Sequence, residues 1–338
     1  MSEFNVVVTQ LGKIGKHPNA DNLEITQVHG GYPCIIKAGS FKQGDLAAYI
    51  PIDAMVSIED ERFSFLGNSQ SPKSIDGKQY YRIKAIRLRG IFSMGLLIKP
   101  EDEWVENQNV QNELKIVKYE PPINIRNTLG CDSPASSQHW MPKYTDIEGL
   151  RKFKDLFQIG EQVVLTEKLH GANSRFTFCD DELRVGSHHM FKQYHKDNIW
   201  WRVAALYELE KKLKDFQSFG IYGEVFGQVQ DLRYGATQTN PLMLRIFDVI
   251  DTTTNRYFHY DEFKALCEQL ELLPVPEIYA GPWLGYEEMA KFADGQSSLA
   301  DHIREGFVVR PVIERWDNRV GRVVLKMIGS EYLLRKNR

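Results

Sequence analysis

Cysteine is scarce and scattered in this chain, and no long apolar run is present. The cysteines form no Cys-x-x-Cys pair, which argues against a disulfide framework or a zinc site; they are Cys34, Cys131, Cys179 and Cys267. No apolar run reaches the ~18 residues of a membrane span, and the sequence starting at Met1 does not resemble a signal peptide. We therefore expect an intracellular monomer without a membrane partner, and the sequence does not separate cytoplasm from nucleus.

A strong charge of one sign is also missing. The chain has 42 Lys and Arg residues against 45 Asp and Glu, a net charge of −3. Nothing global therefore indicates a nucleic-acid-binding protein, and only a local patch could do so. The length of 338 residues exceeds one typical core, which favours two domains.

Turn residues and periodicity divide the chain into three parts. Residues 1–100 contain short predicted strands, at 6–8, 24–28, 34–37 and 46–50, which are typical of a small barrel or sandwich. Residues 101–145 contain an acidic cluster, Pro121-Pro122 and a Ser/Pro segment at 133–137, and we interpret them as a linker. Residues 146–338 mix strands with helices predicted over 198–216 and 261–270, so the expected fold class is α+β.

One lysine has a sequence context that favours chemistry. Lys168 follows the apolar run Val163-Val164-Leu165 and precedes His170 and Gly171. A lysine that loses solvent can act as a nitrogen nucleophile. A solvated strand end is the commoner explanation of such a lysine taken alone.

Four further residues interrupt or end apolar strands. They are Glu224, Phe247, Glu305 and Lys326. Buried charges are costly unless they are paired or bind a metal, so two carboxylates and two lysines on separate strands suit one shared pocket. Each residue alone would fit a turn, a solvated face or the core. Their order and spacing together favour a site.

That order resembles the covalent nucleotidyltransferase superfamily of polynucleotide ligases and capping enzymes. The first motif is Lys168-Leu169-His170-Gly171, and Arg184, Glu224, Phe247, Glu305 and Lys326 match the later ones in order. The His at the third position, with Glu167 before the lysine and Asn173 after the glycine, is similar to RNA ligases of the RNA ligase 2 type. The last motif departs from the usual pattern because it has one lysine instead of two, and Arg322 and Arg310 are candidates for the missing phosphate contact.

The resemblance implies a role for each residue. Lys168 would attack ATP, with Lys326 and Glu305 also catalytic. ATP or AMP would be bound by Glu167, Lys168, Asn173, Arg184, Glu224, Phe247, Lys326 and, as a weaker candidate, Arg151. Glu305, His170 and Glu224 would hold Mg²⁺ or Mn²⁺ and its water shell. Burial, Lys326 and the metal are expected to lower the pKa of Lys168 towards neutrality.

The N-terminal segment His17-Pro18-Asn19-Ala20-Asp21 resembles a turn of tRNA-binding oligonucleotide-binding (OB) modules. A basic stretch follows over 71–99, where Arg82 with Lys84 and Arg87 with Arg89 are expected to form a cationic stripe that binds RNA phosphates. A merely solvated strand face is the alternative. We therefore expect an OB-like β-barrel followed by an α+β nucleotidyltransferase (ATP-grasp-like ligase) domain. This order of domains resembles that of the fifth RNA ligase family.

The sequence thus predicts an ATP-dependent RNA ligase that joins 3′-hydroxyl and 5′-phosphate ends through a lysyl-AMP and an AMP-capped 5′ end. The expected substrate is a nick in duplex RNA or in RNA-containing strands. A DNA ligase or an mRNA guanylyltransferase-like enzyme is the nearest enzyme alternative, and His170 in place of Asp argues against it. A non-catalytic RNA- or tRNA-binding protein is the other alternative, and the intact lysines and glutamates argue against it.

Overall fold

The computed structural model describes residues 4–29, 31–75, 77–119 and 140–335. They form two compact units, the first built mainly from residues up to 121 and the second mainly from those after it. Cys131, Pro121-Pro122 and the Ser/Pro segment at 133–137 lie outside the described residues. Within the described part, no helix is long and apolar enough to cross a membrane.

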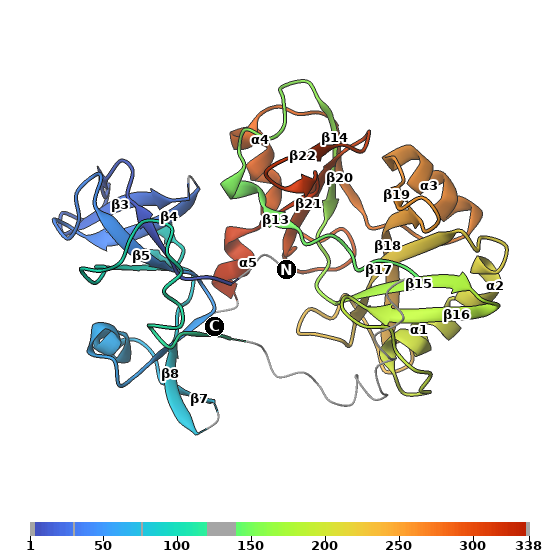
Figure 1. The fold of residues 1–338 in the computed structure, drawn as a ribbon, viewed down its shortest axis with the longest axis horizontal. Helices are drawn as coiled ribbons and strands as arrows, with labels where there is room; N and C mark the ends of the chain where they lie inside the picture. Colours follow the sequence, from blue (N-terminus) through green and yellow to red (C-terminus); the bar gives the residue numbers. More distant parts are fainter. Residues whose placement is uncertain (1–3, 30, 76, 120–139, 336–338) are drawn as a thin grey trace. The chain divides into compact units, whose positions relative to one another are not determined.

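The first unit consists almost entirely of short strands (Figure 1). Its sheets have the orders β1-β5-β11, β2-β3-β4 and β12-β6-β8-β7, with the hairpin β9-β10. The elements are β1 (Val7–Gln10), β2 (Gly15–Lys16), β3 (Leu23–Val28), β4 (Tyr32–Lys37), β5 (Leu46–Ile50), β6 (Ala54–Ser57), the 3-10 helix η1 (Glu61–Asn68), β7 (Lys73–Ile75), β8 (Lys78–Arg82), β9 (Ile86–Leu88), β10 (Ile91–Ser93), β11 (Leu96–Ile98) and β12 (Val117–Lys118). The strands predicted over 6–8, 24–28, 34–37 and 46–50 correspond to β1, β3, β4 and β5.

The described start of the predicted linker differs from the prediction. Trp104, Val110, Leu114 and Ile116 are buried in the core that also contains Val8. Strand β12 pairs with β6. The acidic cluster at 101–106 suggested a solvated connector, but apolar residues within and after it reach the core of the first unit. We therefore place the end of the first unit near residue 119 instead of 100.

The second unit contains two five-stranded sheets, with orders β13-β24-β21-β14-β20 and β16-β15-β17-β18-β19, and the hairpin β22-β23. The strands are β13 (Glu148–Gly149), β14 (Gln162–Glu167), β15 (Ala172–Cys179), β16 (Glu182–Ser187), β17 (Phe219–Gly227), β18 (Leu242–Asp251), β19 (Arg256–Tyr257), β20 (Glu277–Pro282), β21 (Gly306–Pro311), β22 (Trp316–Asp317), β23 (Gly321–Arg322) and β24 (Leu325–Ile328). Pairing is antiparallel from β24 through β21 and β14 to β20 and throughout the β16-β15-β17-β18-β19 sheet.

Helices cover the β15–β18 sheet in Figure 1. They are α1 (Ile199–Leu206), α2 (Leu209–Leu213) and α3 (Tyr260–Gln269), and η4 (Leu150–Lys152), α4 (Tyr286–Ala290), η5 (Lys291–Ala293) and α5 (Ser330–Arg335) complete the helical elements. The single helix predicted over 198–216 is interrupted because Glu208 adopts a left-handed conformation with φ of 51°. Asn198 caps α1 by accepting hydrogen bonds from the N–H groups of Trp200 and Trp201.

Alternation gives the β15–β18 sheet two different faces. Phe176, Ile221 and Leu244 point into the main core with the helices. Asn173, Glu224 and Arg245 are in register across β15, β17 and β18, so their side chains share the opposite face. This polar face belongs to the candidate site.

Candidate active site

Strand β14 brings Lys168 to the end of a buried strand. Its residues Val163–Leu165 are completely enclosed, and β14 lies between β21 and β20. Beyond the strand, the Lys168 N–H still donates to the Gly306 carbonyl oxygen at 3.0 Å. The chain then turns at Gly171, where a Cβ would overlap the Val225 carbonyl oxygen, so the close approach to β17 requires glycine.

Glu305 forms an ion pair with the lysine. Its Oε1 lies 2.8 Å from the Lys168 Nζ, and the exposed fractions of the two side chains are 10% and 27%. Glu305 immediately precedes β21, whose first residue accepts the hydrogen bond from Lys168. The strand pairing itself therefore holds the carboxylate beside the amine.

His170 lies between two carboxylates. Its Nδ1 is 3.2 Å from Glu305 Oε2, and its Nε2 is 2.6 Å from Asp231 Oδ1. The His170 N–H donates to the Tyr234 hydroxyl at 2.8 Å, and the Tyr332 hydroxyl lies 3.3 Å from Nδ1. Both ring nitrogens thus have protein partners, so His170 positions Glu305 in this state and leaves no nitrogen for direct coordination of a metal.

Glu224 completes the charged group around the lysine. Burial, the largest effect, and the nearby Glu305 raise the pKa of the Glu224 carboxyl to about 8, against the attraction of Lys168. Burial would also raise the pKa of Glu305, but Lys168 and His170 outweigh it and hold that pKa at about 2. The pKa of Glu224 is therefore raised and that of the neighbouring Glu305 is lowered, a separation found in many catalytic sites.

The pKa of Lys168 differs from the prediction. Burial acts to lower the pKa of its ammonium group, but Glu305 and Glu224 raise it more, so that pKa lies above its ordinary value. The sequence suggested burial, Lys326 and a metal as the dominant influences. In the folded chain the closest charged partner is a carboxylate, and the amine is held as an ammonium ion.

Strand register places Lys326 on the same face as Lys168. Lys326 pairs with Val308 across β24 and β21, and Val308 pairs with Thr166 across β21 and β14. Paired residues in a sheet point to the same side, and Lys168 follows Thr166 by two positions. Lys326 and Lys168 therefore share one face of this sheet.

The two arginines suggested for the missing phosphate contact are occupied elsewhere. Arg310 Nη1 lies 3.0 Å from Asp248 Oδ1, and Arg322 Nη1 lies 2.6 Å from Asp248 Oδ2. Both guanidinium groups also bind Glu314, and neither side chain is more than 5% exposed. That suggestion was wrong, because both arginines belong to a closed, buried ion-pair cluster.

Glu167 also has partners within the protein. Its Oε1 accepts a hydrogen bond from the Ser297 hydroxyl and its Oε2 from the Ser298 N–H, each at 2.6 Å. The residue is 1% exposed. Its carboxylate therefore fixes the segment at 297–298, and a contact with the nucleoside stays a prediction.

Asn173 and Phe247 lie on the polar face of the β15–β18 sheet. Asn173 pairs with Glu224, and its buried Oδ1 has no hydrogen-bond partner among the described residues. Phe247 follows Arg245 by two positions, and its ring packs edge-on against Tyr144 at 4.8 Å. An unsatisfied amide oxygen and a partly buried ring on the same sheet face fit a nucleoside that would supply a donor and a flat surface.

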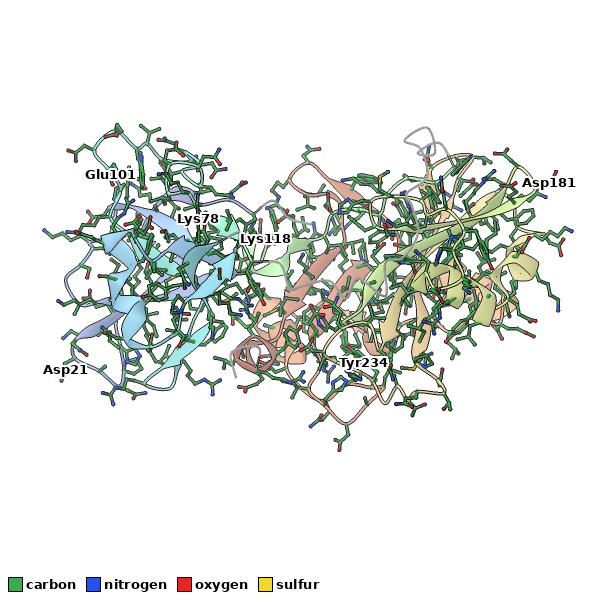
Figure 2. All side chains as sticks on the ribbon, turned by 90° about the horizontal axis from the view of Figure 1, so that it is seen from below. Asp21, Lys78, Glu101, Lys118, Asp181 and Tyr234 are labelled. Atoms are coloured by element: carbon green, nitrogen blue, oxygen red, sulfur yellow. The ribbon has the colours of Figure 1, made fainter. Side chains whose placement is uncertain are left out.

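Arg184 and Arg151 lie outside this cluster. Arg184 forms an ion pair with Glu182 at 2.7 Å and packs over the Trp140 ring at 4.1 Å. It belongs to the β15–β16 hairpin, whose turn at Asp181 lies far from Tyr234 in Figure 2. Arg151 belongs to η4, in a short segment that groups with the first unit. The nucleotide contacts of both arginines stay predictions.

The predicted basic stripe of the first unit is wrong at Arg82. This residue is 7% exposed, forms an ion pair with Asp53 and packs over the Tyr119 ring at 4.1 Å. Lys84 follows the end of β8 and is half-buried, whereas Arg87 and Arg89 are exposed on the β9-β10 hairpin and its turn. Each pair was expected to share one strand face, but Lys84 lies beyond the end of β8, and Arg89 lies in the hairpin turn after β9 with φ of 47°.

Comparison with known proteins identifies both units. Residues 161–328 match the family model described as RNA ligase, and residues 5–100 match an OB-fold domain model. The chain belongs to the RNA ligase family. The predicted layout of an N-terminal OB fold followed by an α+β ligase domain is confirmed, and no curated protein matches the sequence.

Solved structures share the fold over nearly the whole chain. A Naegleria gruberi RNA ligase with pyrophosphate is 24% identical, with a TM-score of 0.83 over 99% of this chain and all of that one (100%). A lysine variant of that ligase with ATP and Mn is also 24% identical, with a TM-score of 0.82 over 98% of this chain and 99% of that one. A glutamate variant with AMP and Mn is again 24% identical, with a TM-score of 0.83 over 99% and 100%.

The carboxylates of this RNA ligase fit a magnesium-like cation held partly by water and phosphate. Among the described residues no group of three or more His, Cys, Asp and Glu side chains could by itself enclose a metal. Mg²⁺ usually uses one or two carboxylates together with substrate phosphates and retains several waters. Glu224 and Glu305, which both act on the Lys168 ammonium, would supply those two carboxylates.

Sequence reasoning missed several residues that the RNA ligase fold adds to the site. They are Asp231, Tyr234, Ser297, Ser298 and Tyr332. Asp231 and Tyr234 lie in the polar loop after β17, where no periodic pattern distinguishes a site residue from a solvated one. The Gly-Glu-Val-Phe-Gly context of Glu224, just before that loop, was the only signal that pointed there.

Proposed function

We propose that the chain is an ATP-dependent RNA ligase that joins a 3′-hydroxyl to a 5′-phosphate through a lysyl-AMP. The observation that carries this proposal is the position of Lys168, which lies 2.8 Å from Glu305 at the end of β14 and on the same sheet face as Lys326. The ATP- and AMP-containing structures of the Naegleria gruberi ligase support the choice of nucleotide.

The first step would form a bond between the Lys168 Nζ and the α-phosphorus of ATP and break the bond to the leaving pyrophosphate. Only the neutral amine can attack, so the ammonium must first lose a proton and its ion pair with Glu305. A divalent cation at Glu305 and Glu224 would draw those carboxylates away from the ammonium, lower its pKa and stabilise charge on the phosphate oxygens. Lys326 would contribute a second positive charge on the same face.

Two further steps would complete the joining of RNA ends. The AMP would pass from Lys168 to the 5′-phosphate, and the 3′-hydroxyl would then attack that activated phosphate and release AMP. Asn173, with its unpaired Oδ1, and Phe247 would bind the nucleoside throughout. Arg87 and Arg89 remain the candidates for RNA contact in the first unit. Nicks in duplex RNA are the proposed substrate, RNA repair the proposed process, and Mg²⁺ or Mn²⁺ the proposed metal.

Covalent labelling tests this function. The protein is incubated with ATP or GTP labelled at the α-phosphate and a divalent cation, and the denatured chain is examined for attached nucleotide. We expect label from ATP, no label in Lys168→Ala, and none in Lys168→Arg, because a guanidinium stays protonated at any working pH. Label from GTP alone would instead indicate a guanylyltransferase, and undiminished labelling of Lys168→Ala would place the nucleophile elsewhere.

A further inference from the structure

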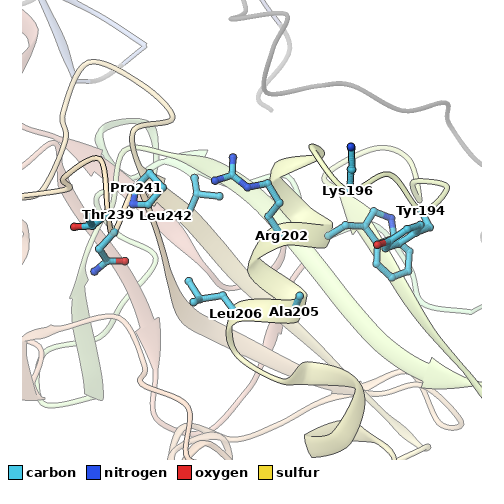
Figure 3. Close-up of a pocket in the computed structure, with 10 residues that line it drawn as sticks. Tyr194, Lys196, Arg202, Ala205, Leu206, Thr239, Pro241 and Leu242 are labelled. Carbon is cyan, nitrogen blue, oxygen red and sulfur yellow. The ribbon is translucent and has the colours of Figure 1, made fainter.

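A hollow in the second unit lies on the exposed side of α1. Its volume is about 540 Å³, within the range of small-ligand pockets. Its walls come from the segment before α1, from α1 itself and from the end of the loop that enters β18 (Figure 3). The residues that line it are Tyr194, Lys196, Trp201, Arg202, Ala205, Leu206, Thr239, Asn240, Pro241 and Leu242.

The lining combines flat apolar surface with positive charge. Tyr194 is 74% exposed and meets the Trp201 ring edge-on at 5.2 Å, while Leu206 is 58% exposed on α1. Lys196 and Arg202 are exposed, and neither forms an ion pair with another described residue. Their side chains extend to the same side in Figure 3. No carboxylate lines the hollow, so its two cations are not neutralised locally.

We propose that this hollow binds one unstacked nucleotide of a single RNA strand. A base that has left its stack requires an aromatic or apolar surface, which Tyr194 and Leu206 provide. The flanking phosphates require cations, which Lys196 and Arg202 provide. This inference rests on the proposed function, because RNA is then the substrate, and it adds a subsite for an unpaired nucleotide to an enzyme proposed to seal duplex nicks.

One loop links the hollow to the catalytic cluster. The residues between β17 and β18 run from Gln228 to Pro241. Asp231 and Tyr234, in the first half of the loop, bind His170. Thr239 and Pro241, near its end, line the hollow. An RNA strand bound there would therefore contact the same loop that orients the partner of Glu305.

Fluorescence anisotropy with a short labelled single-stranded RNA tests the subsite. We compare the wild-type chain with Tyr194→Ala and with the double variant Lys196→Ala/Arg202→Ala. Loss of a base stack is expected to weaken binding by at least about fivefold. Loss of the two cations should weaken binding and reduce the salt dependence of log K by about 1.4. The control Lys211→Ala/Lys214→Ala removes two exposed charges from α2 and its end, and it should bind like the wild type.

The outcomes separate this inference from the proposed function. Unchanged binding by Tyr194→Ala, or an equal loss in the α2 control, would overturn the subsite. A loss of affinity confined to a fully paired duplex of the same sequence would also overturn the subsite, because a base stacked inside a duplex cannot stack on the Tyr194 ring. Labelling of Lys168 by ATP should persist in every pocket variant. A wild-type chain that binds RNA but never takes up nucleotide would overturn the ligase proposal and leave the subsite intact.

Discussion

Two clusters of charged side chains in the second unit use similar residues in opposite ways. In the closed cluster, Arg310 and Arg322 pair with Asp248 and Glu314, and no side chain is more than 8% exposed. The open cluster is the group Lys168, His170, Glu224, Asp231 and Glu305. Its lysine is 27% exposed and its Asp231 is 57% exposed.

Charge balance explains what each cluster can do. The closed cluster has two positive and two negative groups in contact, so its charges balance within the protein. The open cluster has three carboxylates for one lysine and one histidine, and burial together with the nearby Glu305 raises the pKa of Glu224 to about 8. A surplus of negative charge beside solvent can be balanced by a cation, whereas a closed network only holds strands together.

Breaking the closed cluster should have the largest effect on stability. Asp248→Asn removes the carboxylate shared by Arg310 and Arg322 and leaves two guanidinium groups buried around Glu314 alone. We expect the free energy of unfolding to fall by about 3–5 kcal/mol, measured by chemical denaturation. Glu288→Gln, which removes an exposed partner of Lys291, is the matched control and should change it by less than about 1 kcal/mol. Equal effects would erase the distinction between closed and exposed pairs.

We expect the open cluster to make the free energy of unfolding depend on pH. The folded-state pKa of Glu224 is about 8, above the ordinary value of 4.5 that applies when the chain unfolds. Between pH 4.5 and 8 the folded chain therefore holds a proton at Glu224 that the unfolded chain has lost. The stability that comes from binding this proton is lost as pH rises from 4.5 through 8. In the presence of a chelator, Glu224→Gln should gain stability relative to the wild type over that range, by at least about 1 kcal/mol. If the free energies of unfolding of the wild type and Glu224→Gln changed in parallel with pH, the raised pKa of Glu224 would be contradicted.

Asp231→Ala should have a smaller effect, on rate instead of stability. Asp231 is exposed and binds only the far nitrogen of His170, so its loss frees the imidazole without opening the core. Removing such an orienting partner typically costs about 10–100-fold in activity. We expect the rate of Lys168 labelling at saturating ATP to fall by that factor with KM for ATP little changed. Asp231→Asn, which can still hydrogen-bond, should recover part of the loss, and a purely KM effect would instead make Asp231 an ATP contact.

Local patterns predicted the elements that surround the lysine. The apolar run of β14, the turn glycine after His170 and the polar residues that end apolar strands are all visible in sequence, because strand burial and turn chemistry depend on neighbouring residues. Local patterns failed where burial depends on distant residues. Arg82, Arg310 and Arg322 resemble solvated cations in sequence, but each is enclosed with a carboxylate. The sequence contains no signal for those partners.

The sequence by itself determined the types and order of the proposed reactive groups: one lysine as the proposed nucleophile, two glutamates on or next to later strands and a second lysine near the end. Only the tertiary structure decided which groups meet. The partners of His170 lie 61, 135 and 162 positions away, at Asp231, Glu305 and Tyr332. The antiparallel register of β14, β21 and β24 also fixes whether Lys326 shares a face with Lys168. A shift of one residue in that register would reverse the face of every side chain, and local sequence does not encode which residue lies opposite which.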